Sequence, residues 1–183
     1  MPVVTALLRG VNVGGNCKLP MATLRSVCDS LGHEGTVTYI QSGNAVFRTK
    51  KRDLGKVAAE LESAIEKEVG FCPGVSLRTL AELESVVVNN PFAGRADLNP
   101  SRLLVTFFPV DPGEVARAKV REVDVSPEEL HAVGSEIYAY FHEGVGKTKL
   151  PFGQVDRAIG CRGTARNWNT VLKLLELARS AAA

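Results

Sequence analysis

The chain has a polar segment near its N-terminus whose residue types suit contact with an anion. This segment is RGVNVGGNCKLP, residues 9–20, in which glycines and asparagines lie between Arg9 and Lys18. Glycine permits a positive φ, and successive backbone N–H groups in such a loop form an anion-binding nest. The segment lacks both the GxxxxGK[ST] spacing of a P-loop and the GxGxxG spacing of a dinucleotide fold. It predicts an anion site at Arg9, Asn12, Gly14, Gly15 and Lys18; the alternative is an ordered structural turn with incidental charges.

A second polar segment contributes Gln41, Ser42, Gly43 and Asn44, between two β-rich runs that predict a hairpin. Ser42 lacks the GxSxG spacing of a hydrolase nucleophile, so a hydrogen-bonding turn serine is the better interpretation. In the predicted topology the first strand ends at the edge of the sheet where this hairpin turns. We therefore expect these residues to lie beside the segment 9–20.

A third polar group lies near the C-terminus, where ARNWNT predicts the start of the last helix. Arg166 has the fork geometry that binds a carboxylate or phosphate through two hydrogen bonds. Asn167 and Asn169 are further candidates for contact with a ligand, whereas Trp168 matches the apolar stripe of the helix and is expected in the core. Convergence of this group with the first two segments is an assumption, since the sequence does not determine how the halves pack.

The elements that must position these residues follow from hydrophobic periodicity and from stop signals. Strands are predicted at residues 3–8, 36–41, 45–49, 74–78, 102–108, 130–133 and 137–141. Helices are predicted at residues 20–31, 53–69, 79–87, 112–120, 154–159 and 167–179. The first six elements have the order βαββαβ of a ferredoxin-like unit. The fold class is therefore α+β, with a ferredoxin-like half at 1–90, a connection at 91–100 and a smaller α+β half at 101–183.

Composition places the chain among ordinary globular proteins and excludes several classes. Of its 183 residues, 22 are basic and 20 acidic, and 45% are hydrophobic. The net charge of +2 argues against a generic polyanion binder, but it conceals a segment of net −4 at 111–136 and one of net +5 at 144–173. No apolar run approaches the ~20 residues of a membrane span, and no signal peptide is indicated, so a cytoplasmic location is expected.

Neither the cysteines nor the histidines have the spacing of a metal site. The four cysteines are scattered without a CxxC pair and are interpreted as free thiols of a reducing compartment. The three histidines form no HExxH motif. No metal is predicted, the sequence indicates no particular cofactor, and no nucleophile or acid–base pair can be assigned for an enzyme.

Several segments together resemble a bacterial family catalogued as domain of unknown function 1697. They are LLRGVNVGGNCKLPMATLRS, TYIQSGNAVF, NPF and TARNWNTVLKL, and the resemblance covers nearly the whole chain. It implies a two-part α+β fold with a ferredoxin-like N-terminal half, and it brings no established activity. The motif positions of the family fall on Arg9, Gly10, Asn12, Gly14, Gly15, Lys18, Gln41, Ser42, Gly43, Asn44, Arg166, Asn167, Trp168, Asn169 and Thr170. Cys17 and Pro151-Phe152-Gly153 depart from the more polar residues expected at those places.

Three hypotheses about function follow. The leading one is binding of a small phosphorylated or otherwise anionic ligand, such as a nucleotide, at the first two segments with Arg166 and Asn167 closing the site. The second is binding of nucleic acid through the basic C-terminal third, which includes Lys147 and Lys149. The third is a structural or partner-binding module whose polar motifs only form turns and caps. No contact with a membrane is expected, and the oligomeric state is open.

Overall fold

The computed structural model describes all of residues 1–183, which form two compact units. The first unit comprises Met1–Ser85 together with Lys173–Ala183, and the second comprises Val86–Leu172. The chain therefore passes from the first unit to the second after Ser85 and returns to the first after Leu172, whereas the sequence predicts a single connection at residues 91–100.

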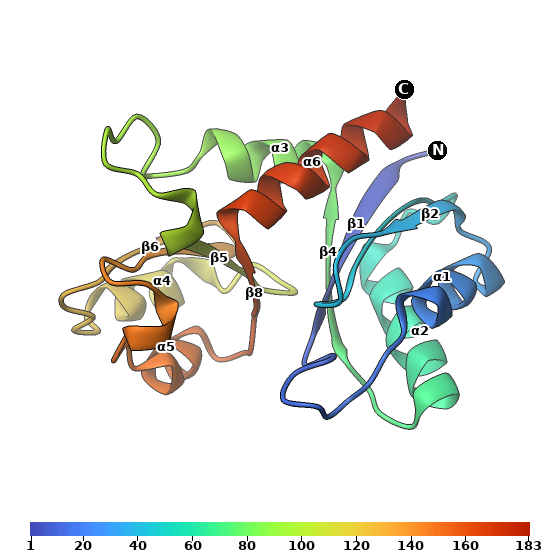
Figure 1. The fold of residues 1–183 in the computed structure, drawn as a ribbon, viewed down its shortest axis with the longest axis horizontal. Coiled ribbons are helices and arrows are strands. Elements are labelled where there is room, and N and C mark those ends of the chain that lie inside the picture. The colour runs from blue at the N-terminus through green and yellow to red at the C-terminus, as the bar shows by residue number, and fades with distance from the viewer. The chain divides into compact units, whose positions relative to one another are not determined.

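The first unit contains a four-stranded antiparallel sheet in the order β2-β3-β1-β4. Helices α1 and α2 pack on one face of this sheet around β1, and their apolar residues form one core (Figure 1). The order βαββαβ is the one that the sequence predicts. The elements are β1 (Val3–Arg9), α1 (Met21–Ser30), β2 (Glu34–Thr38), β3 (Asn44–Arg48), α2 (Leu54–Val69) and β4 (Gly74–Thr79), followed by α3 (Leu80–Val88), whose last three residues belong to the second unit.

Local sequence signals account for several of these boundaries. The Asp53 carboxylate caps α2 by accepting a hydrogen bond from the Lys56 N–H at 3.0 Å. Gly70 ends the same helix with a φ of 81°, in the left-handed region that favours glycine. Thr79 and Glu82 form a capping box at the start of α3, in which each side chain accepts from the other residue's N–H.

The second unit repeats the element order of the first. Its four-stranded antiparallel sheet has the order β6-β7-β5-β8. Strands β5, β6, β7 and β8 therefore occupy the same places in this sheet as β1, β2, β3 and β4 occupy in the first. Residues of α4 and α5 pack with strand residues in a second core. The elements are β5 (Leu103–Phe107), α4 (Gly113–Arg121), β6 (Glu129–Val133), β7 (Glu136–Tyr140), α5 (Phe152–Ile159) and β8 (Thr164–Asn167), with short 3-10 turns at Pro100–Arg102 and Val145–Lys147. The last helix, α6 (Trp168–Ala182), begins in the second unit, and its residues from Lys173 onward belong to the first.

The main difference from the predicted elements is β8. The sequence places Arg166 and Asn167 at the start of the last helix, but both lie on this strand and α6 begins at Trp168. Gly163, the residue before this strand, lies tightly against β5: a Cβ there would come within 2.9 Å of the Phe107 carbonyl oxygen. The α+β class is otherwise as predicted.

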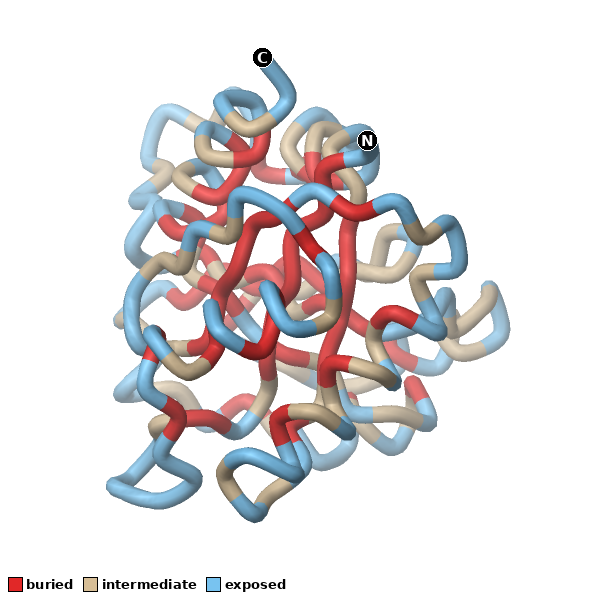
Figure 2. Tube along the Cα trace, turned by 90° about the vertical axis from the view of Figure 1, so that its right-hand side faces the viewer, coloured by how far each residue is buried: buried red, intermediate tan, exposed pale blue.

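Burial follows the strands in both units. All residues of β1 except Arg9 are buried, so the prediction of a strand covered on both faces is confirmed. Continuous buried stretches, visible in Figure 2, follow β1, β3, β4 and β7, whereas β2 and β6 contain no buried residue and most loop residues are exposed. None of the helices combines the length and apolar character that crossing a membrane requires.

Candidate functional site

The candidate site is the loop edge of the first unit, which we define as residues 9–20 and 39–44. Asn12 joins its two segments through its side-chain amide. Asn12 Nδ2 donates to the carbonyl oxygens of Leu19 at 2.9 Å and Gln41 at 2.7 Å, and Asn12 Oδ1 accepts from the Leu19 N–H at 2.9 Å. The predicted meeting of the two segments is therefore confirmed. Because both amide hydrogens are engaged within the protein, Asn12 holds the loop in place.

The tip of the loop is a tight reversal of the chain. Val13 and Asn16 form an isolated antiparallel bridge, and the Asn16 N–H donates to the Val13 carbonyl at 3.1 Å. Gly14 and Gly15 lie between them with φ angles of 59° and 79°. Two consecutive positive φ angles favour glycine at both central positions of such a turn. The tip is exposed and presents backbone, with no side chain on either glycine, to solvent.

Two apolar residues anchor this loop beneath its polar surface. Val11 is 2% exposed and Leu19 is fully buried, and both belong to the core of the first unit. The sequence prediction did not include them. Hydrophobicity alone gives no signal for these anchors, because Val13 in the same loop is equally apolar and yet 67% exposed.

Gly43 lets the second segment approach the first. It has a φ of 79°, and a Cβ there would lie 2.4 Å from Val11 Cγ2 and 2.9 Å from Leu8 Cβ. Its carbonyl accepts a hydrogen bond from the Leu8 N–H at 2.8 Å. The buried Asn44 holds the turn from within, since its Nδ2 donates to the Tyr39 carbonyl and to Ser42 Oγ. Ser42 is thus a hydrogen-bonding residue of the turn, as the sequence predicts.

The loop edge carries two cationic side chains. Arg9, at the end of β1, packs over Gly74 of β4, where a Cβ would lie 3.0 Å from its Nε. Lys18 is exposed, two residues before the N-cap of α1, and Gln41 is exposed on the neighbouring turn. No acidic residue occurs between residues 9 and 20. The segment 9–20 itself therefore carries a net positive charge, from Arg9 and Lys18.

The N-terminus of α1 adds backbone donors to the same edge. Its N-cap is Pro20, which makes no side-chain capping hydrogen bond, and the first turn of the helix contains no acidic residue. The first N–H groups of an α-helix have no partner within the helix and carry partial positive charge. The sequence prediction that these donors lack a side-chain cap is confirmed.

Arg166 lies in the second unit, on β8. It is 6% exposed, and its Nη1 donates to Thr164 Oγ1 at 2.7 Å and to the Ala165 carbonyl at 2.9 Å. Burial lowers the pKa of its guanidinium to about 10, so the group remains cationic at neutral pH. The contribution of Arg166 to ligand binding, which the sequence suggests, stays a prediction.

Asn167 and Asn169 lie where β8 passes into α6. Asn167 Nδ2 donates to the Ser101 carbonyl at 3.0 Å, and Asn167 Oδ1 accepts from the Asn169 N–H at 3.0 Å. Asn167 therefore caps the first turn of α6 and ties it to the residues before β5. Trp168 is 6% exposed, which agrees with the core position predicted for it.

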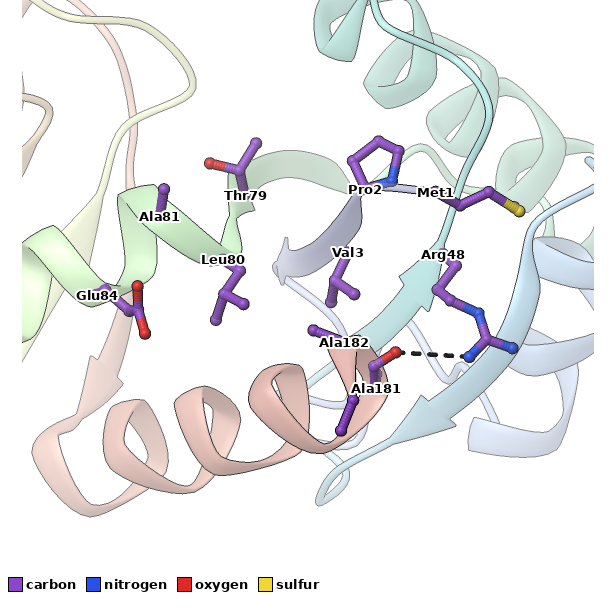
Figure 3. A pocket seen from close by; sticks show the side chains of 11 residues that line it. Met1, Pro2, Val3, Arg48, Thr79, Leu80, Ala81, Glu84, Ala181 and Ala182 are labelled. Carbon is purple, nitrogen blue, oxygen red and sulfur yellow. Dashed lines mark hydrogen bonds between the residues drawn. The ribbon is translucent and has the colours of Figure 1, made fainter.

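A separate hollow of about 570 Å³ lies in the first unit at the opposite end of the strands (Figure 3). Its lining includes Val3 of β1 and Arg48 of β3, which pair with each other at one end of the two strands. The loop edge lies at the other end, where Leu7 of β1 pairs with Asn44 of β3. Within it, Arg48 Nη1 lies 3.5 Å from the Ala181 carbonyl oxygen. None of the predicted site residues lines this hollow. No cluster of three or more His, Cys, Asp or Glu residues in the structure could hold a metal ion.

Two successive βαββαβ units, each followed by a helix, define a tandem α+β protein with its candidate site in the first unit. The chain belongs to the family described as Protein of unknown function (DUF1697), whose model matches residues 1–138. It is also similar to a solved structure, the conserved bacterial protein SP0830 from Streptococcus pneumoniae. That match has a TM-score of 0.76 and 29% sequence identity, and it covers 98% of this chain and 99% of the other. No curated protein matches the chain.

Proposed function

We propose that the first unit binds a small phosphorylated or otherwise anionic ligand, such as a nucleotide, at the loop edge. The observation that carries the proposal is the Asn12 clamp, which holds a glycine-rich loop against the uncapped N-terminus of α1. A helix N-terminus attracts anions because its free N–H groups and its dipole act together. A loop that is already ordered loses little conformational entropy when a ligand binds.

The residues of the loop edge have different roles in this proposal. Arg9 and Lys18 supply charge, and Gln41 and the backbone of Gly14 and Gly15 supply hydrogen-bond donors. Asn12, Ser42, Gly43 and Asn44 position these groups through the contacts described above. Arg166, Asn167 and Asn169 lie in the second unit, and a contribution of these residues to ligand binding stays a prediction.

A thermal-shift panel of nucleotides, sugar phosphates and inorganic phosphate tests the ligand class. A ligand at one hundred times its Kd stabilises the folded protein by about 2.7 kcal/mol, which raises Tm by several degrees. Lys18→Gln is expected to weaken the shift. The matched control is Lys50→Gln, an exposed lysine that follows β3 at the opposite end of the strands. Equal shifts in both variants, or no shift with any compound, would remove support for the proposal.

The second hypothesis, nucleic-acid binding, has a different signature. Lys147 and Lys149 are exposed in the second unit and Arg162 follows α5, so a polyanion would meet several cations there. Affinity for RNA or DNA through such contacts falls steeply as salt rises. Binding of an oligonucleotide that weakens with salt and is lost in Lys147→Gln/Lys149→Gln, but not in Lys18→Gln, would favour this hypothesis over the first.

A further inference from the structure

His33 is a buried imidazole in the first unit that neither the fold nor the proposed site uses as a polar group. The residue lies between the end of α1 and the start of β2 and is 4% exposed. Neither Nδ1 nor Nε2 has a hydrogen-bond partner, although both atoms are shielded from solvent. A buried polar group without a partner costs free energy, and a buried charge without one costs more. The ring is therefore accommodated only in its neutral form.

The surroundings of His33 also disfavour a charged ring. The imidazole stacks on the fully buried Phe47 of β3, with the ring centres 4.3 Å apart and the planes inclined by 15°, so Phe47 covers one face of the ring. The face of a phenyl ring itself attracts a cation, so it is the burial and not the stacking that opposes the charged form. Burial lowers the pKa of His33 below its ordinary value, and the ammonium of Lys51 lowers it further. The carboxylate of Glu60 opposes this effect, but Glu60 Oε2 already accepts a hydrogen bond from Lys51 Nζ at 2.5 Å.

The groups of α1 beside His33 do not replace this missing partner. The Cys28 carbonyl accepts the backbone N–H of His33 at 3.1 Å, which leaves the imidazole unaffected. Burial raises the pKa of the Cys28 thiol to about 12, so this thiol remains neutral wherever His33 titrates. The Asp29 carboxylate accepts a hydrogen bond from Thr36 Oγ1 at 3.1 Å.

We propose that His33 is an acid-operated switch: protonation of its ring forces it out of the core and opens the junction between α1 and β2. The junction is suited to local opening because β2 is an edge strand and is mostly exposed. Segments with few buried contacts open at lower free energy than the core does. The opening exposes residues 31–38, between α1 and the end of β2, while α2, β1 and β3 keep their shared core.

The direction of the pH dependence follows from linkage. The pKa of His33 is lower in the folded state than in the open state, so the open state binds more protons below neutral pH. Stability of the junction is full above the open-state pKa near 6.5 and is lost progressively as pH falls toward the folded-state pKa. Because one proton is taken up, the equilibrium constant for opening rises by up to about tenfold per pH unit in that interval.

Amide hydrogen exchange measured from pH 7.5 to pH 4.5, and corrected for intrinsic exchange rates, tests this inference on the full chain. In the wild type the opening constant of the segment 31–38 is expected to rise steeply below pH 6.5. His33→Phe keeps an aromatic ring on Phe47 and removes the titratable group, so its opening constant should stay flat. His142→Gln, a change of a histidine exposed in the second unit, should leave the wild-type profile unaltered.

A second pair of variants keeps the test decisive if His33→Phe folds poorly. Lys51→Gln removes the nearby positive charge and releases Glu60, which makes protonation of the folded ring easier and the acid effect smaller. Lys67→Gln removes an exposed charge in the last turn of α2, which does not act on His33, and should not change the effect. A pH-independent opening constant in the wild type would overturn the inference. So would a total rise as large in Lys51→Gln as in the wild type, or a comparable rise in a folded His33→Phe.

Discussion

Asn12 shows how one side chain organises a loop of a dozen residues. Its amide makes three hydrogen bonds that link the start of the loop to its end and to the neighbouring turn. The residue itself has a φ of 55°, a left-handed conformation that asparagine adopts more readily than most residues. The spacing of glycines and asparagines predicted an ordered polar loop here, but it could not show which asparagine faces inward.

Replacing Asn12 by alanine should destabilise the protein by about 2–3 kcal/mol. The change removes three hydrogen bonds, each with a net contribution of about 0.5–1.5 kcal/mol, and leaves alanine in an unfavourable backbone conformation. Urea unfolding measures the difference in free energy. Asn16→Ala, at the exposed tip of the same loop, is the matched control and should change stability by less than about 0.5 kcal/mol. Equal losses in the two variants would contradict the role given to the Asn12 clamp.

A position requires glycine either because its backbone has a positive φ or because a Cβ would collide with a neighbour, and Gly14 and Gly43 distinguish these two reasons. Both have positive φ angles, but a Cβ at Gly14 meets nothing within 4 Å whereas one at Gly43 meets Val11 and Leu8. Gly14→Ala should therefore cost about 1–2 kcal/mol from backbone strain alone. Gly43→Ala should cost about 1–3 kcal/mol more, because the added methyl group overpacks the contact. Thermal unfolding of both variants checks the difference, and a smaller loss in Gly43→Ala would show that the two segments are not tightly apposed.

Among the elements, long periodic segments were predicted well and one short strand was not. The helix α2 has a regular apolar stripe, an N-cap at Asp53 and a stop at Gly70, and each of these signals is present in the structure. Strand β8 has four residues, its sequence shows no clear alternation of apolar and polar residues, and it leads directly into α6. Its position depends on pairing with β5, a contact more than fifty residues distant in sequence, which no local pattern encodes.

The pairing of β8 with β5 predicts that Gly163, the residue before β8, tolerates no larger side chain. An alanine at Gly163 would place its Cβ 2.5 Å from Thr106 Cγ2 and 2.9 Å from the Phe107 carbonyl oxygen, so a loss of about 1–3 kcal/mol is expected. Gly153, in the first turn of α5, meets nothing within 4 Å. Gly153→Ala should instead stabilise the protein by about 0.4–1 kcal/mol because alanine favours the helix. Chemical denaturation of the two variants should thus give changes of opposite sign.

At the scale of the whole molecule, the chain uses one topology twice. The strand orders β2-β3-β1-β4 and β6-β7-β5-β8 correspond position by position, yet the sequence shows no convincing self-similarity. Topology depends on where apolar strands and helices occur, and many different residues satisfy that pattern. The same reasoning explains why the candidate site was located only in part: the meeting of residues 9–20 with residues 39–44 follows from topology, whereas the individual contacts follow from packing.

The most direct test of the proposed function is a phosphate titration of the full chain followed through its backbone amide NMR signals. Binding at the loop edge should shift the signals of Gly14, Gly15 and residues 21–24 at the start of α1 in a saturable manner. The same titration of Lys18→Gln should need a higher phosphate concentration, by about tenfold if the lost charge–phosphate contact contributes about 1.4 kcal/mol. Unchanged signals at the loop edge, or shifts confined to the basic residues of the second unit, would contradict the account.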